Sequence, residues 1–233
     1  MLQQLAERGL VQGERIGIDA STMEANAALR AIRRREDGES YRAMLTRMAA
    51  ASGVPTPTAA ELKPFDRARK GKRFSNAEWA SPTDPEARIT RMPDGRTRLA
   101  YKPEHAVDLD TEAIVAAEIH PADRGDTTTL DATLAAAVAA RGLDAAGRAP
   151  TIDRPAELIA DKGYHSRAVL KDLASGPWQT RIAESKPKEV QRWRGDLDAR
   201  RAVYGNRGRL CSGAGKEALA LRAEKVERSF ALR

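Results

Sequence analysis

Two aspartates stand where short apolar runs of the sequence end. Asp19 closes the run RIGI, and Asp161 follows the run LIA and precedes Gly163 by two positions. Ligands of α/β sheets gather at the carboxyl ends of the strands, so both side chains are placed where a site would form. Each also has a plainer interpretation on its own. Asp161 would be a turn residue, and Asp19 would be a helix N-cap.

The last helical stretch offers a third carboxylate, Glu227. Val226 and Phe230 lie four residues apart and so share one helix face. Glu227 follows Val226 at about 100° around the helix, at the edge of that face. The plainer interpretation is an exposed helix charge, and Glu224, one turn earlier, could take the same role.

Three converging carboxylates would repel one another. A hard divalent cation such as Mg²⁺ or Mn²⁺ prefers oxygen ligands and relieves that repulsion. Two such ions held by carboxylates can activate an attacking oxygen and stabilise a leaving oxygen in phosphoryl transfer. The three side chains would then be metal ligands of a phosphodiester-cleaving site, and no protein nucleophile is expected. Many other triples could be drawn from the 33 acidic residues.

Composition narrows the class of protein. The chain has 233 residues, 41% hydrophobic and only 4% aromatic, with a formal net charge of +7. This charge favours a polyanionic partner, and the planar fork of arginine suits phosphate. One cysteine, Cys211, excludes a disulfide framework and a cysteine zinc site. Without a run of about 18 apolar residues, we expect no membrane span and a cytoplasmic, nucleoid-associated protein.

The hydrophobic pattern predicts an α/β fold, a mixed sheet flanked by helices. A loop-rich, basic insertion over 52–103 follows the first strand and helices. Both ends of the chain look cut, so we expect a fragment of a longer protein. A polar, Arg-rich stretch before the last helix has no predicted element. The predicted strands are 15–19, 97–101, 104–110, 113–120, 157–160 and 178–183, and the predicted helices are 21–35, 41–51, 127–141 (capped by Gly142), 166–174 and 218–232.

Five segments resemble a known family in the same order along the chain. They are IGIDASTMEANA, SNAEWASPTDPEARI, YKPEHAVDLDTEAIVAAEIHPADRGDTTTL, IADKGYHS and RAEKVERSFA. The chain resembles bacterial insertion-sequence transposases of the DDE superfamily, which have an RNase-H-like catalytic core. The resemblance runs from about residue 13 to the end of the chain. It implies that Asp19, Asp161 and Glu227 are the catalytic, metal-binding triad with Mg²⁺ or Mn²⁺, as two ions.

The same resemblance implies contacts with DNA. Related transposases carry a Tyr-x-x-Arg signature before the glutamate. Here Tyr204 and Arg207 have that spacing, but Arg207 lies 20 residues before Glu227. Arg222 and Lys225, which are closer to Glu227, could contact the phosphates instead. We also expect phosphate contacts from Lys162, His165 and Arg228. For His165 the alternative of a surface histidine at the start of a helix stays open. The segment 1–12 would be the remnant of an N-terminal helical region, and the 13–233 segment the catalytic domain.

The expected function is metal-dependent cleavage at transposon ends followed by strand transfer into target DNA. The partners would be DNA and further copies of the chain, in a dimer or higher multimer. Two alternatives stay open: an RNase-H-like nuclease without strand transfer, and an inactive remnant that only binds nucleic acid. Trp79 would either stack on a displaced base or, as we favour, anchor a loop against the core.

Overall fold

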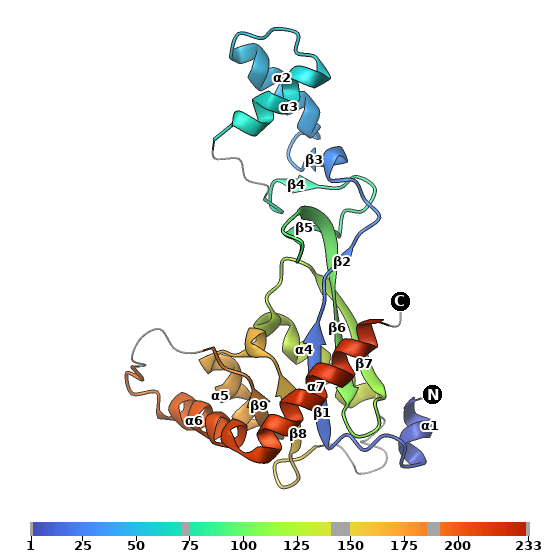
Figure 1. The fold of residues 1–233 in the computed structure, drawn as a ribbon, viewed down its shortest axis with the longest axis vertical. Helices are drawn as coiled ribbons and strands as arrows, with labels where there is room; N and C mark the ends of the chain where they lie inside the picture. Colours follow the sequence, from blue (N-terminus) through green and yellow to red (C-terminus); the bar gives the residue numbers. More distant parts are fainter. Residues whose placement is uncertain (1, 71–74, 141–149, 186–191, 232–233) are drawn as a thin grey trace. The chain divides into compact units, whose positions relative to one another are not determined.

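The computed structural model describes residues 2–70, 75–140, 150–185 and 192–231 (Figure 1). They form two compact units. The core unit comprises Met1–Ser21, Pro103–His120 and Arg124–Arg233, and the insertion unit comprises Thr22–Lys102 with Pro121–Asp123. Strand β6 (Thr97–Asp108) gives its first half to the insertion unit and its second half to the core unit.

The core unit is built on a mixed sheet. The strands β1 (Arg15–Ala20), β8 (Ala156–Ala160) and β9 (Trp178–Ile182) are parallel neighbours in the order β1-β8-β9. On its other side β1 pairs with β6 in antiparallel register, and β7 (Ile114–Pro121) also pairs with β6. The predicted α/β class with a mixed sheet is confirmed.

Alternation along β1 decides which helix covers which face, because successive side chains of a strand point to opposite faces. Ile16 and Ile18 are fully buried in one cluster with residues of α4 (Asp126–Ala140), α5 (Arg167–Ser175) and α6 (Leu197–Cys211). Ala6 of α1 (Leu2–Glu7) joins this cluster. Gly17 faces the other way, beneath Val226 of the long helix α7 (Gly213–Ala231). Figure 1 shows α7 crossing the sheet.

The insertion unit has a hydrophobic core of its own. The strands β2 (Met23–Glu24) and β5 (Arg88–Arg91) pair with the first half of β6, and β3 (Arg33–Arg34) pairs with β4 (Trp79–Ala80). Two helices, α2 (Tyr41–Ala51) and α3 (Ala59–Ala68), and the short η1 (Leu29–Ala31) complete it. Trp79 is 3% exposed and packs in this core, so the anchoring role that we favoured is the one observed.

The predicted helix over 21–35 is wrong. Met23 and Glu24 pair instead with Tyr101 and Ala100 of β6, and the backbone of Arg34 pairs with β4. Helix propensity is a weak preference that tertiary pairing overrides. Each alanine of this segment favours a helix by only a few tenths of a kcal/mol of free energy over most other residue types. The strand pairs therefore decide the conformation.

Two predicted strands, 97–101 and 104–110, are one continuous strand, β6. Pro103, which lies between the two predicted strands, has no N–H to donate. Its carbonyl accepts a hydrogen bond from the backbone N–H of Ser21 at 2.9 Å, so pairing continues through it. The other strands lie within a few residues of their predicted bounds.

Two helices formed where none was predicted. Helix α3 lies in the stretch expected to be loop-rich and begins with a capping box between Thr58 and Glu61. Helix α6 lies in the Arg-rich stretch and buries small residues and Asn206. The Asn206 amide donates to the Ile182 carbonyl and accepts from the Ile182 N–H, both at 2.8 Å, which fixes the helix to β9. Helix α7 begins five residues before its predicted start, and Gly142 lies outside the described residues.

Among the described residues, no helix has the length and apolar character needed to cross a membrane.

Gly17 allows α7 to pack closely on β1. A Cβ at this position would lie 2.7 Å from Leu109 Cδ2 and 2.8 Å from Val226 Cγ2. We predict that Gly17→Ala lowers the free energy of unfolding by about 1–3 kcal/mol, because overpacking a core costs that much. Urea denaturation measures the change.

Gly208→Ala is the matched control. A Cβ there meets no atom within 4 Å, and the residue lies inside α6. Alanine is preferred to glycine inside a helix by roughly 0.5–1 kcal/mol, so this variant should be equally or more stable. Equal stabilities of the Gly17→Ala variant and the wild type would contradict the close-packing argument.

Candidate active site

The parallel register of β1 and β8 brings the two predicted aspartates together. Ile18 pairs with Ala160, so the next residues, Asp19 and Asp161, end neighbouring strands at one edge of the sheet. The negative charge of Asp161 contributes to raising the pKa of Asp19, as expected for nearby carboxylates. Two of the three predicted ligands therefore lie side by side at the carboxyl edge.

Asp19 is held in an ion pair. Its Oδ2 lies 2.7 Å from Nη1 of Arg222, a residue of α7 that is only 8% exposed, and its Oδ1 accepts from the N–H of Ala20 at 2.9 Å. Burial raises the pKa of the Asp19 carboxyl, and Arg222 opposes this rise. The arginine thus offsets part of the cost of placing a carboxylate beside a second one.

Asp161 is the N-cap of a short 3₁₀ helix, η2 (Lys162–Tyr164). Its Oδ1 accepts from the N–H of Gly163 at 2.8 Å. A side chain at Gly163 would overlap the carboxylate of Asp126, which approaches from the first turn of α4. Gly163 therefore makes room for a third acidic side chain close to Asp161. The sequence offered only a weak signal for Asp126, an acidic residue in a helical first turn.

A buried polar network lies beneath this loop. Glu104 of β6 is fully buried and accepts hydrogen bonds from the hydroxyls of Tyr164 (2.8 Å), Thr129 (2.8 Å) and Thr133. Tyr164 follows directly on the Asp161–Gly163 turn, and the two threonines belong to α4. Burial raises the pKa of the Tyr164 hydroxyl, with Glu104 adding to the rise, so it stays a proton donor. The network ties the turn that carries Asp161 to α4 and β6.

Two histidines that were predicted to be structural lie in packed positions. Nε2 of His120 is 3.1 Å from the Thr133 hydroxyl, at the edge of the Glu104 network. His105 pairs with Asp19 across β6 and β1, stacks on Phe230 and is hydrogen-bonded through Nδ1 to the Ser229 hydroxyl at 2.8 Å. His105 thereby fixes the end of α7 to the sheet.

Glu227 is exposed on α7 and has not joined the two aspartates. Within the described parts of the chain, no three His, Cys, Asp or Glu side chains are grouped so that they could hold a metal ion. The flank that Glu227 occupies is nevertheless informative. Lys225 is about 200° away around the helix, and its Nζ donates to the carbonyl of Leu109, opposite the start of β1. Glu227 therefore leaves α7 on a different flank from Lys225, and its side chain is exposed.

The residues expected to contact DNA are mostly engaged within the protein. Arg207 makes a two-pronged pair with Glu184 at 2.6 and 2.7 Å, and its guanidinium lies 5.0 Å from the ring centre of the exposed Tyr204. His165 is largely buried, 3.9 Å from Glu184, and burial lowers its pKa. The interpretation of His165 as a surface histidine is therefore wrong.

The remaining members of the expected set lie on α7 and η2. Arg222 pairs with Asp19, and Lys225 lies 3.5 Å from Glu112. Arg228 pairs with Glu112 at 3.0 Å and with Glu224. Lys162, next to Asp161, is exposed and is the basic side chain nearest in sequence to the two aspartates. Cys211 is exposed and free.

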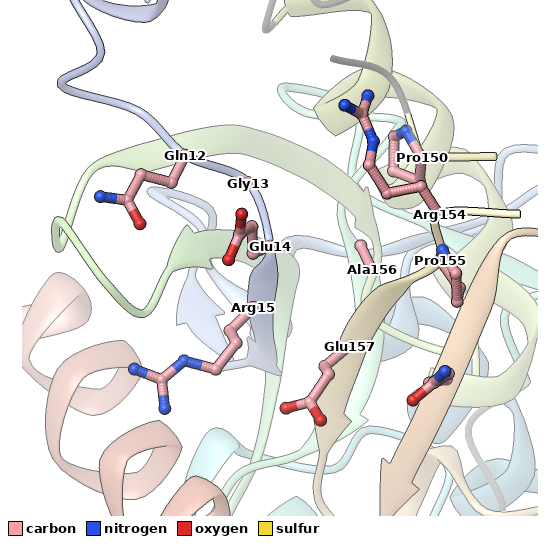
Figure 2. Close-up of a pocket in the computed structure, with 10 residues that line it drawn as sticks. Gln12, Gly13, Glu14, Arg15, Pro150, Arg154, Pro155, Ala156 and Glu157 are labelled. Carbon is pink, nitrogen blue, oxygen red and sulfur yellow. The ribbon is translucent and has the colours of Figure 1, made fainter.

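A cavity of about 610 Å³ lies at the other edge of the parallel strands (Figure 2). It is lined by residues at the starts of β1 and β8, including Arg15 and Glu157, and by none of the predicted site residues. Arg15 already pairs with Asp110, and Glu157 with Arg181. Two of its charged side chains are thus paired within the protein, and the aspartate edge remains the candidate site.

Comparison with known protein families gives one match. The family model described as "Transposase DDE domain" matches residues 18–231 and so includes both aspartates and Glu227. No curated protein and no solved structure matches the chain.

The Glu104 network generates a stability prediction. Tyr164→Phe removes one of the donors to a fully buried carboxylate, and a lost hydrogen bond to a charged group costs about 1.5–3 kcal/mol. We expect that loss in the free energy of unfolding, measured by urea denaturation. Tyr204→Phe, at an exposed tyrosine, should change stability by less than about 0.5 kcal/mol. Similar losses in both variants would argue against a special role for the buried hydroxyl.

Proposed function

The chain belongs to the DDE transposase family, and we propose that it cleaves phosphodiester bonds at transposon ends with divalent metal ions. The freed 3′-hydroxyl would then attack target DNA in a transesterification, without a covalent protein intermediate. The single observation that carries the proposal is the register of β1 and β8, which sets Asp19 beside Asp161 inside the segment that the family model covers.

The donor set suits a hard cation. Asp19 and Asp161 present carboxylate oxygens, which Mg²⁺ and Mn²⁺ prefer, and burial raises the pKa of Asp19 so that a nearby cation is favourable. Bound Mg²⁺ or Mn²⁺, as one or two ions, would activate the attacking oxygen and stabilise the leaving one. Arg222 now neutralises Asp19 and would be released to a phosphate when a metal takes its place.

Glu227 would be the third ligand. It is exposed on α7, one residue from Val226, which packs on β1, and it leaves the helix on a different flank from Lys225, whose Nζ donates to the Leu109 carbonyl. A rotation of its side chain, with a small shift of α7, would be needed to bring its carboxylate to the aspartates. Lys162, Arg222 and Tyr204 are the proposed contacts to the DNA backbone at this site, and synapsis of two ends would require at least a dimer.

A second candidate is a protein that binds nucleic acid without cutting it. Two observations on the predicted triad favour this candidate. Asp19 is ion-paired with Arg222, and the Glu227 side chain is exposed on α7. An RNase-H-like nuclease that hydrolyses without joining strands uses the same three carboxylates. A joining assay with a pre-cut 3′-hydroxyl end separates it from a transposase.

Nicking of supercoiled DNA in Mn²⁺ tests the active site. We expect Asp161→Asn and Asp19→Asn to lower the rate by at least the 10–100-fold that loss of a metal's outer-shell partner typically costs. EDTA should abolish nicking. Asp172→Asn, at an exposed aspartate of α5, is the control and should nick at the wild-type rate.

Metal binding has a readout that is independent of cleavage. Mn²⁺ should raise the melting temperature of the wild type, because a ligand that binds only the folded state stabilises it. The rise should be lost in Asp161→Asn and kept in Asp172→Asn. Nicking at equal rates by wild type and Asp161→Asn would refute the proposed site and leave the binding-only candidate.

The third ligand can be tested separately, since α7 offers two glutamates one turn apart. Glu227→Gln should reduce nicking by about 10-fold or more, as for the other ligands. Glu224→Gln should leave nicking near the wild-type rate because Glu224 pairs with Arg228 on the helix surface. If the two variants behave in the reverse way, Glu224 is the ligand and the assignment of Glu227 is wrong.

A further inference from the structure

The positive charge of the chain is concentrated in the insertion unit. Residues 22–102 and 121–123 contain 17 lysines and arginines and 11 acidic residues. The rest of the chain has 23 basic and 22 acidic residues, so it is almost neutral. The overall charge of +7 therefore arises almost entirely from the unit that lacks the predicted triad.

Much of the acidic charge in this unit is already engaged. Glu39 pairs with Arg47, and Glu24 and Asp94 pair with Arg98. Asp66 accepts from Tyr41 and lies near Arg69. Glu61 and Asp84 are likewise engaged, by the N-cap of α3 and by the Tyr101 hydroxyl. These carboxylates neutralise particular arginines and leave other cations unopposed.

Three of these other cations lie along α3 and directly after it. Lys63 and Arg67 lie four residues apart, and Lys70 follows three residues later, just beyond the helix end. Lys63 and Arg67 therefore share one face of the helix, with their Cβ atoms about 5–6 Å apart. Lys70 continues the basic stretch directly after the extended C-cap residue Arg69. All three are exposed, and none is paired with an acidic side chain in the described residues. We call these three residues the α3 basic row.

The row is presented on a rigid support. Leu62 and Phe65 pack α3 into the core of the insertion unit, on the other side of the helix from the basic row. The capping box of Thr58 and Glu61 fixes the helix start. Arg69, between the row and the core, is held by the Tyr41 hydroxyl at 3.1 Å and by Asp66. Because its backbone is already fixed, the row loses little conformational entropy when it binds a partner with regularly spaced charges.

We propose that the α3 basic row docks on the phosphate backbone of duplex DNA, outside the catalytic site. Charge complementarity selects a polyanion, and the aromatic residues argue for a duplex over a single strand. Single-strand binding relies on exposed aromatic rings that stack on bases. Trp79 is buried and Tyr41 is hydrogen-bonded to Asp66, so the described part of this unit offers no such platform.

This inference rests on the proposed function only in taking DNA as the substrate, because it requires no metal and no cleavage. Backbone contacts carry no sequence information by themselves, so the row would hold DNA of any sequence while the catalytic unit acts. It assigns the insertion unit a role that the sequence left undefined.

The test is the salt dependence of binding to a labelled duplex of arbitrary sequence, in EDTA. The triple variant Lys63→Gln/Arg67→Gln/Lys70→Gln removes three phosphate contacts. Each contact contributes about 0.9 to the slope of log K against log salt concentration. We expect the slope to become shallower by about 2–3 and the affinity at low salt to fall at least about 10-fold.

The control removes the same charge from the core unit. Arg8→Gln/Arg201→Gln/Lys216→Gln replaces three exposed basic residues and should keep the wild-type slope. Thermal unfolding checks that both triple variants fold. Equal loss of affinity in the two triples, no measurable wild-type binding to the duplex, or a larger effect on single-stranded than on duplex DNA would each overturn the proposal.

Failure of this proposal can be told apart from failure of the proposed function. Asp161→Asn should lose nicking and keep the wild-type salt slope. If the active site is wrong but the row is right, Asp161→Asn nicks normally while the α3 triple still shows the shallower slope. If the row is wrong but the active site is right, the α3 triple keeps the wild-type slope while Asp161→Asn fails to nick.

Discussion

The core unit depends on one constraint, the repulsion between two carboxylates at the ends of adjacent parallel strands. The register of β1 and β8 forces Asp19 and Asp161 together, and burial makes the charge on Asp19 costly. Arg222 reaches from α7 to Asp19 and offsets part of this cost.

The elements around the pair serve to hold it in place. Gly17 lets α7 approach β1 closely enough for Arg222 to reach Asp19. On the other face of the sheet, the buried Glu104 accepts hydrogen bonds from the hydroxyls of Tyr164 and of threonines of α4. These hydrogen bonds fix the turn after Asp161. The buried Glu104 carboxylate is tolerated because its hydrogen bonds are satisfied. Glu104 in turn orders the backbone that positions the Asp161 carboxylate.

The two units differ in their content of charged residues. The core unit is nearly neutral overall, and it carries Asp19 and Asp161 at one edge of its sheet. The insertion unit carries the excess of basic residues on a separately packed core.

The sequence by itself determined the α/β class, most strands and the helices with a clear period, because strand ends and apolar runs are local signals. It also indicated Asp19 and Asp161, which stand at such ends. Tertiary structure alone decided the segment 21–35, where pairing with β6 overrides alanine's helix preference, and the burial of α6 through Asn206. It alone decided that Arg222 pairs with Asp19 and that Glu104 lies beneath Tyr164, since both contacts join residues far apart in sequence.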